Sequence, residues 1–210
     1  MNSRLPKSFY LNDALQVAPR LLGKTLVRKL DNSYIRCKIV ETEAYIGPHD
    51  KGAHVYNNKR TPRTEPLFLS GGHTYIYLIY GMYHCLNVVT AKQDMAQGVL
   101  IRAVEPLDEV SLNIIRQNRN IRSKKVFDLT NGPGKLCKAL KIDQSLNQYN
   151  LITGNELFLE EGDSNIPIVC APRINIPYAQ EYILVPWRFY IHDNPYVSVI
   201  DPHATPIQDI

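Results

Sequence analysis

The sequence has few cysteines, and their scatter argues against two common ways of stabilising a small domain. Four cysteines are spread over the 210 residues, without a CxxC pair and without histidines at metal-ligand spacing: Cys37, Cys85, Cys137 and Cys170. This pattern predicts neither a disulfide framework nor a zinc site. Reduced thiols are typical of the cytosol, so we expect a cytoplasmic protein with no bound metal.

Long apolar runs and familiar nucleotide or nucleophile motifs are also missing. No stretch has the length of a signal peptide's apolar region or of a membrane-spanning helix, so we expect a protein without a membrane segment. There is no GxGxxG fingerprint and no serine or cysteine nucleophile motif. The run from Asn131 to Lys135 lacks P-loop spacing, although N–H groups at the helix it opens, with Lys135, could hold one phosphate.

Positive charge is concentrated in one segment. Residues 116–141 contain eight Lys or Arg and one acid, whereas residues 142–210 contain nine acids and two arginines. Such a segment is typical of a protein that binds a polyanion, and a solvated helix face is the alternative. Thirteen tyrosines against five phenylalanines favour rings that also form hydrogen bonds, as at binding surfaces.

Residues 75–89 are expected to form a β-hairpin with an apolar tip. Two strand-like runs flank Gly81, which stands between Tyr80 and Met82. Hairpin tips usually carry Asn, Asp or Gly, which tolerate positive φ and face water well. The apolar tip is therefore either buried under another segment, which we favour from the pattern alone, or inserted into a partner.

A second hairpin is predicted from residue 26 to residue 45, and it carries two carboxylates. Ile35, Cys37 and Ile39 alternate with basic residues, and regular alternation would place Glu41 and Glu43 on the same inward face. A carboxylate on a core face is costly unless it is paired. It signals either a functional site or a structural salt bridge with an arginine.

The remaining segments predict short strands and a few helices. Residues 46–73 show little periodicity, which is typical of a functional or disordered loop. Among the residues of that loop that could line a site or contact phosphates are His49, His54, Lys59, Arg60 and Arg63. Asn12 and Asp108 are expected to cap helices, and Gly98–Val104 to form a strand that carries Arg102. Further strands are expected at residues 156–160, 168–176, 188–192 and 196–199.

These elements predict a mixed α/β (α+β) fold in one domain over residues 1–210. Its sheet should be curved and mostly antiparallel, with peripheral helices and a protruding β-hairpin. One carboxylate among aromatic rings suits hydrolysis through an activated water. A basic segment with an apolar wedge suits a kinked duplex, and together these parts describe an enzyme that extrudes a base and hydrolyses its bond.

Several motifs also carry a resemblance over nearly the whole chain. They are Val40-Glu-Thr-Glu-Ala-Tyr-Ile-Gly-Pro48, Arg60-Thr-Pro-Arg63, Tyr75-Ile-Tyr-Leu-Ile-Tyr-Gly-Met-Tyr83 with Asn87, Leu100-Ile-Arg-Ala103 with Glu105-Pro106, and Asn131-Gly-Pro-Gly-Lys-Leu136. In this order they resemble the alkyladenine (3-methyladenine) DNA glycosylase family. The resemblance implies a monofunctional glycosylase that flips alkylated or deaminated purines from duplex DNA and leaves abasic sites. It implies no cofactor, a monomer that approaches the minor groove, and, in a bacterium, association with the nucleoid.

The resemblance also implies roles for individual residues. Glu43 matches the glutamate that activates the attacking water, and Arg102 the arginine that helps to place it. The base pocket would comprise Tyr45, His54, Tyr77 and Asn87. Tyr80 matches the intercalating residue, with Met82 beside it. The DNA backbone is expected to contact Lys59, Arg60, Arg63 and Lys135. With the matched motifs, the hairpin tip is better interpreted as a wedge than as a buried turn.

Two other functions fit part of the same pattern. A non-catalytic RNA- or DNA-binding module would use the basic segment and stack bases on the aromatic rings. A hydrolase of free nucleosides would need the carboxylate and the rings, but neither the basic segment nor the wedge.

Overall fold

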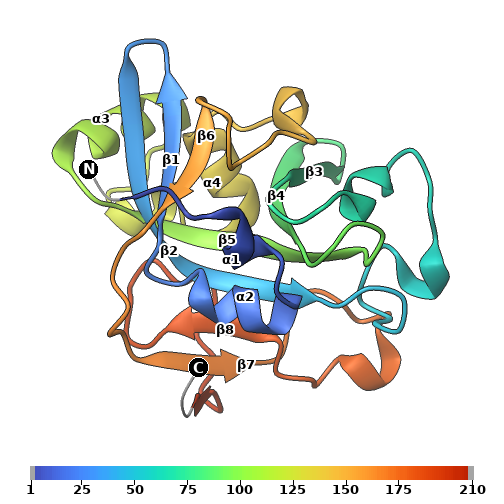
Figure 1. Cartoon of the computed structure of the whole chain (residues 1–210). Coiled ribbons are helices and arrows are strands. Elements are labelled where there is room, and N and C mark those ends of the chain that lie inside the picture. The colour runs from blue at the N-terminus through green and yellow to red at the C-terminus, as the bar shows by residue number, and fades with distance from the viewer. Residues whose placement is uncertain (1–2, 208–210) are drawn as a thin grey trace.

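One sheet organises the chain, whose residues 3–207 are described by a computed structural model (Figure 1). The described strands are β1 (Thr25–Leu30), β2 (Ser33–Tyr45), β3 (Thr74–Ile79), β4 (Tyr83–Thr90), β5 (Gln97–Pro106), β6 (Leu157–Glu160), β7 (Ile168–Ala171), β8 (Arg188–Ile191) and β9 (Thr205–Pro206). The α-helices are α1 (Lys7–Tyr10), α2 (Ala14–Arg20), α3 (Glu109–Arg119) and α4 (Pro133–Ala139). Short 3₁₀ turns lie at η1 (Tyr56–Asn58), η2 (Glu65–Phe68), η3 (Val126–Leu129), η4 (Gln144–Leu146) and η5 (Gln180–Tyr182).

Strand β2 is the centre of this sheet. The main path runs β3-β4-β5-β2-β8-β7-β9, while β1 pairs with β2 and with β6. Every pairing between these strands is antiparallel. The predicted mixed α+β fold with a mostly antiparallel sheet is therefore confirmed, including the hairpin from β1 to β2.

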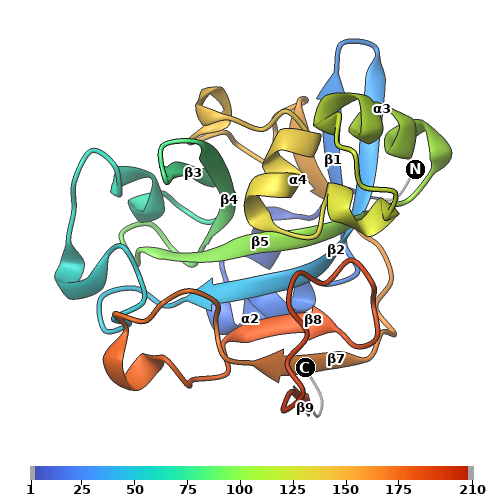
Figure 2. The same ribbon diagram turned by 180° about the vertical axis from the view of Figure 1, so that it is seen from behind.

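Helices cover β2 on both faces, which corrects the expected alternation after Ile39. Helix α2 lies against one face of the sheet, and α3 and α4 lie against the other (Figures 1 and 2). The register between β2 and β5 shifts between Ile39 and Thr42. All residues from Val40 to Ala44 are consequently buried, whichever face they point to. Burial of the two glutamates follows from the central position of β2 and not from a single inward face.

Capping residues set the helix starts, and one expected cap is wrong. Asp13, and not Asn12, caps α2 by accepting a hydrogen bond from the Leu15 N–H at 2.8 Å. The Asn12 amide instead donates to the carbonyls at the end of α1. Asp108 caps α3 as predicted, and its carboxylate accepts from the Ser111 N–H at 2.7 Å.

The C-terminal third has less strand than its composition predicts. The expected strand at 168–176 ends at Ala171, because Pro172 follows and cannot donate to a neighbouring strand. Residues 196–199 form no strand. The segment between β7 and β8 is instead a long connection, and it contributes to the candidate site below.

The β3–β4 hairpin presents its tip to solvent. Tyr80 is 75% exposed and Met82 66% exposed, so the first alternative, burial under another segment, is wrong. Both Tyr80 (φ +53°) and Gly81 (φ +68°) adopt left-handed backbone conformations. That conformation is unusual for a bulky residue such as Tyr80 and is typical of a site under functional constraint.

Candidate active site

Two glutamates of β2 are buried two residues apart, and their partners differ. The carboxylate of Glu41 lies 3.1 Å from Arg102 Nε and 3.1 Å from Arg188 Nη1. It also accepts a hydrogen bond from the Ser198 N–H at 2.7 Å. With two guanidinium groups and a backbone donor, Glu41 fits the expectation of a structural salt bridge.

Glu43 is held by three different donors and faces a cleft. Its Oε1 accepts from the Ile174 N–H at 2.7 Å and lies 3.2 Å from Arg102 Nη1. Its Oε2 accepts from the Tyr45 hydroxyl at 2.8 Å. The side chain has no exposed surface in the free protein, yet it contributes to the wall of the cleft. Such a carboxylate is oriented before a substrate arrives.

Arg102 on β5 connects the two carboxylates. Burial alone would lower its pKa, but Glu43 and Glu41 outweigh burial and raise the pKa above its ordinary value. Its Nη2 also donates to Ser198 Oγ at 3.3 Å. Arg102 therefore remains a cation whose position is fixed from two sides, and one of those sides is Glu43.

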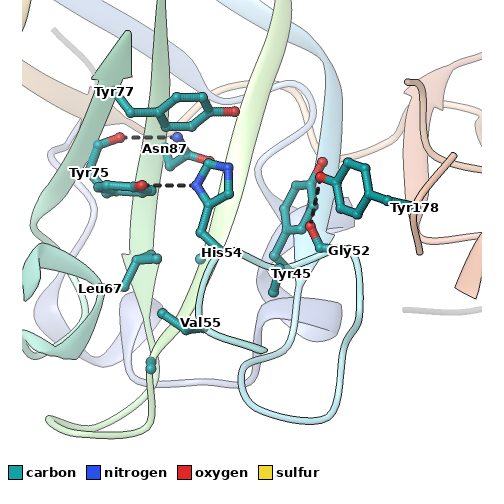
Figure 3. A pocket seen from close by; sticks show the side chains of 12 residues that line it. Tyr45, Gly52, His54, Val55, Leu67, Tyr75, Tyr77, Asn87 and Tyr178 are labelled. Atoms are coloured by element: carbon teal, nitrogen blue, oxygen red, sulfur yellow. Dashed lines mark hydrogen bonds between the residues drawn. The ribbon is translucent and has the colours of Figure 1, made fainter. Parts of the chain in front are cut away.

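A small aromatic pocket (Figure 3) lies next to Tyr45, the residue whose hydroxyl donates to Glu43. Its twelve lining residues are Tyr45, Gly52, Ala53, His54, Val55, Leu67, Tyr75, Tyr77, Asn87, Ala96, Gly98 and Tyr178. Rings of Tyr75, Tyr77 and His54 gather on one side, and those of Tyr45 and Tyr178 on the other. Its aromatic walls suit a flat heterocycle that stacks between rings.

His54 enters this pocket as a neutral ring. Its Nδ1 and the Tyr75 hydroxyl form a hydrogen bond of 2.9 Å, and its ring meets that of Tyr77 edge-on at 4.7 Å. Burial, followed by the charges of Arg63 and Lys59, lowers the pKa of His54 to about 4. At neutral pH the imidazole is therefore an uncharged wall with one donor nitrogen and one acceptor nitrogen.

The pocket opens into an outer cleft. Four residues line both cavities and thus frame the opening between them: Tyr45, His54, Tyr77 and Tyr178. Glu43, Arg102 and the exposed Tyr80 lie along the cleft. Three further basic residues also line it, namely Arg63, Arg119 and Lys135. The cleft thus joins a buried carboxylate to a positively charged surface.

The structure does not bring all the predicted site residues to this cleft. Asn87 lines the inner pocket only, and its amide donates to the Tyr75 carbonyl at 3.1 Å. Lys59 and Met82 are exposed but do not line either cavity. Arg60 is engaged with Glu65 at 2.6 Å and Asp94 at 3.0 Å, away from the cleft lining.

Several contributors were missed from the sequence. Tyr178 lines both cavities, and the Ile174 N–H reaches Glu43, but both lie in the connection between β7 and β8 that was expected to be a strand up to residue 176. Arg173, which also lies in this connection, forms a bidentate pair with Asp50 at 2.6 and 2.7 Å, and both side chains are fully buried. In the sequence, Arg173 is an isolated arginine among apolar residues, and nothing in that pattern identifies Asp50 as its partner.

Metal and membrane features are limited in the described part of the chain. Within residues 3–207 no three His, Cys, Asp or Glu side chains gather in a way that could hold a metal ion. No helix there combines the length and the apolar character needed to cross a bilayer.

Comparison with known proteins points to one family. The sequence profile of the family described as methylpurine-DNA glycosylase (MPG) matches residues 8–195. A protein of Natranaerobius thermophilus is 50% identical over 198 residues, covering 93% of this chain and 99% of that protein. A protein of Clostridium botulinum is 52% identical over 198 residues, covering 92% and 98% respectively. Both carry 3-methyladenine DNA glycosylase as a provisional name.

Proposed function

The chain belongs to the methylpurine-DNA glycosylase family. We propose that it extrudes damaged purines from duplex DNA and hydrolyses the bond between each purine and its sugar with a water activated by Glu43. As a member it is a monofunctional DNA glycosylase, a hydrolase of N-glycosyl bonds in DNA repair. One observation carries the proposed mechanism. A buried carboxylate with three fixed donors stands at the mouth of an aromatic pocket that opens into a basic cleft.

The proposed reaction is a displacement at the sugar carbon C1′. A water oxygen forms a bond to C1′ while the bond from C1′ to the purine nitrogen breaks, and the electron pair of that bond leaves with the base. Glu43 accepts the proton of the water and stabilises the positive charge that develops on the sugar. Arg102, fixed by Glu41, orients Glu43 and the water. An alkylated purine is already cationic and leaves readily, whereas a neutral lesion needs more help from the pocket.

Recognition of the flipped base is assigned to the aromatic walls. Tyr45 on one side and His54 with Tyr77 on the other leave a slot for stacking. Asn87 at the inner end would crowd the 2-amino group of guanine and favour adenine-like bases. Substrates proposed on this basis are alkylated or deaminated purines such as 3-methyladenine and hypoxanthine.

Tyr80 is proposed to fill the gap that the flipped nucleotide leaves in the duplex, approached from the minor groove. We expect Tyr80→Ser to weaken binding to a duplex with a lesion by about 1–3 kcal/mol, because a stacked aromatic ring is lost. Fluorescence titration of duplexes with and without a lesion measures this loss. Tyr34→Ser is the control, since Tyr34 is an exposed tyrosine on β2 that lines neither cavity. Equal affinity of the Tyr80→Ser variant and the wild type for the damaged duplex would contradict intercalation.

Arg119 is proposed to contact a DNA phosphate. It lines the cleft, and among residues 3–207 it forms no salt bridge; its Nε is buried without a hydrogen-bond partner. We expect Arg119→Glu to weaken duplex binding and to reduce the slope of log affinity against log salt concentration by about 1. Arg122→Glu is the matched control, because Arg122 belongs to the same basic segment but lies outside the cleft lining. If the salt slopes of the two variants are identical, Arg119 makes no specific phosphate contact, and the basic segment is only a solvated surface.

A panel of substrates tests the proposed function against its two alternatives. Duplexes that carry 3-methyladenine, 7-methylguanine, hypoxanthine or ethenoadenine are incubated with the protein, alongside the corresponding free nucleosides, and abasic sites and free bases are scored. We expect base release from the duplexes. Binding without release would favour a non-catalytic nucleic-acid module, and equal turnover of free nucleosides would favour a nucleoside hydrolase.

A further inference from the structure

We infer that Tyr178 is a specificity-determining residue, which limits the size of the substituent that a damaged purine carries next to its glycosidic bond. The inference rests on the proposed function of the site and goes beyond it. No motif in the sequence assigns a role to Tyr178, and it differs in this from Tyr45, His54 and Tyr77.

The position of Tyr178 is the first observation. Only four residues of the described chain line both the inner pocket and the outer cleft, and Tyr178 is one of them. Its ring lies beside that of Tyr45, on the side of the pocket opposite His54 and Tyr77 (Figure 3). In the free protein it is 58% exposed, so its ring presents a surface that a bound nucleotide would cover. Tyr178 therefore stands at the mouth of the pocket and not at its inner end.

The segment that carries Tyr178 is fixed at several points. Arg173 forms its buried bidentate pair with Asp50 and also donates to the Ala44 carbonyl at 3.0 Å. The next residue, Ile174, donates its N–H to Glu43. The Tyr178 hydroxyl reaches the Gly52 carbonyl at 3.4 Å (Figure 3).

Contacts just beyond Tyr178 tie the same two segments together at the surface. Lys51 Nζ lies 2.9 Å from Glu181 and 2.5 Å from the Gln180 amide oxygen. A Cβ at position 52 would lie 2.7 Å from Arg173 Nη2, so a larger residue there would displace the buried Arg173–Asp50 pair. A ring on so well anchored a segment acts as a wall of fixed position rather than as a mobile surface side chain.

Chemistry decides which part of the substrate this wall meets. Glu43 must reach C1′, so the sugar stays in the outer cleft and the purine enters with its far edge toward Asn87. Of the purine nitrogens that are alkylated, N3 is the one whose substituent points roughly along the glycosidic bond, because N3 and N9 are bonded to the same carbon. An alkyl group at N3 therefore points to the mouth of the pocket, where Tyr178 stands. A methyl group fits beside the Tyr178 ring without displacing it, whereas a larger group collides with that ring.

Single-turnover excision from three duplexes tests this inference. One carries 3-methyladenine, one 3-benzyladenine and one hypoxanthine, which has no substituent at N3. We expect Tyr178→Ala to raise the rate for the benzyl lesion relative to the methyl lesion by about 10-fold or more, within the range that single-group discrimination in a pocket reaches. The ratio of hypoxanthine to 3-methyladenine should stay the same. Tyr178→Phe, which keeps the ring and removes the hydroxyl, and the distant control Tyr34→Ala should retain all wild-type ratios.

Two results would overturn the inference. One is a benzyl-to-methyl ratio that does not change in Tyr178→Ala, and the other is an equal loss of rate on all three duplexes, which a loop anchor alone would give. Tyr178→Leu repeats the test if the alanine variant does not fold. If the wild type releases no base from any duplex, the proposed function itself fails. If it does release base and the ratios do not move, only the role of Tyr178 fails.

Discussion

Replacing Glu43 with glutamine is expected to reduce base release by at least about 10²–10⁴-fold, which is the usual contribution of a general base. The substitution keeps the shape of the side chain and an oxygen that can accept from Tyr45 or from the Ile174 N–H. It removes the capacity to take a proton and the negative charge that faces the sugar. Single-turnover release of base from a duplex with 3-methyladenine measures the loss.

Duplex binding should survive the same substitution, because Tyr80 and the basic cleft residues are unchanged. Glu156→Gln is the matched control, since Glu156 is largely exposed and pairs with Arg28 away from the site. It should retain wild-type release. If Glu43→Gln releases base at the wild-type rate, Glu43 does not activate the water. If the variant loses both base release and duplex binding, the substitution has disturbed the structure.

Glu41→Gln is expected to lower the free energy of unfolding, whereas Glu43→Gln is expected to lower the rate of base release. Glu41 is the shared partner of Arg102 and Arg188, and none of the three side chains is more than 8% exposed. Breaking a buried ion pair by removing one partner costs roughly 3–5 kcal/mol, because an uncompensated charge stays buried. For a chain of this size that corresponds to a fall in melting temperature of roughly 6–20 °C.

Denaturant unfolding of the two variants separates these roles. In Glu43→Gln, Arg102 keeps Glu41 as its counter-ion, so the free energy of unfolding should change much less than in Glu41→Gln. The two substitutions lie two residues apart on one strand and remove the same charge, so each is the control for the other. Equal destabilisation by both would show that the carboxylates are equivalent and would contradict the division proposed here.

Local pattern was sufficient for much of the fold. Alternation around Ile35 and Cys37 predicts the β1–β2 hairpin, and Asp31, in the left-handed region at φ +50°, makes the turn. Asp108 predicts the start of α3. These features depend on neighbours in sequence, so a window of residues contains the information.

Long-range packing explains what the pattern missed. Regular alternation cannot represent a central strand such as β2, where helices on both faces bury Val40 to Ala44 alike. The strand expected at residues 168–176 ends before Pro172. The segment that follows Pro172 is a connection that places Ile174 and Tyr178 at the site.

Part of the candidate site was likewise predicted from the sequence, and part of it was not. The resemblance supplied Glu43, Arg102 and the aromatic residues, and the structure brings these together. Asp50 and Arg173 are 123 residues apart and form one buried pair. No local signal joins them, because the contact exists only after the sheet has formed. Which basic residues reach the cleft was equally hidden, since Arg63 and Lys135 do so and Lys59 and Arg60 do not.

Hydrolysis of the glycosidic bond of a damaged purine in duplex DNA is the activity proposed for this chain. It is tested by chromatography of the products from a duplex that contains 3-methyladenine, with the strand examined before and after alkali. We expect free 3-methyladenine, an intact strand before alkali and cleavage at the abasic site after it. A duplex that binds the protein but retains its methylated base would contradict this mechanism.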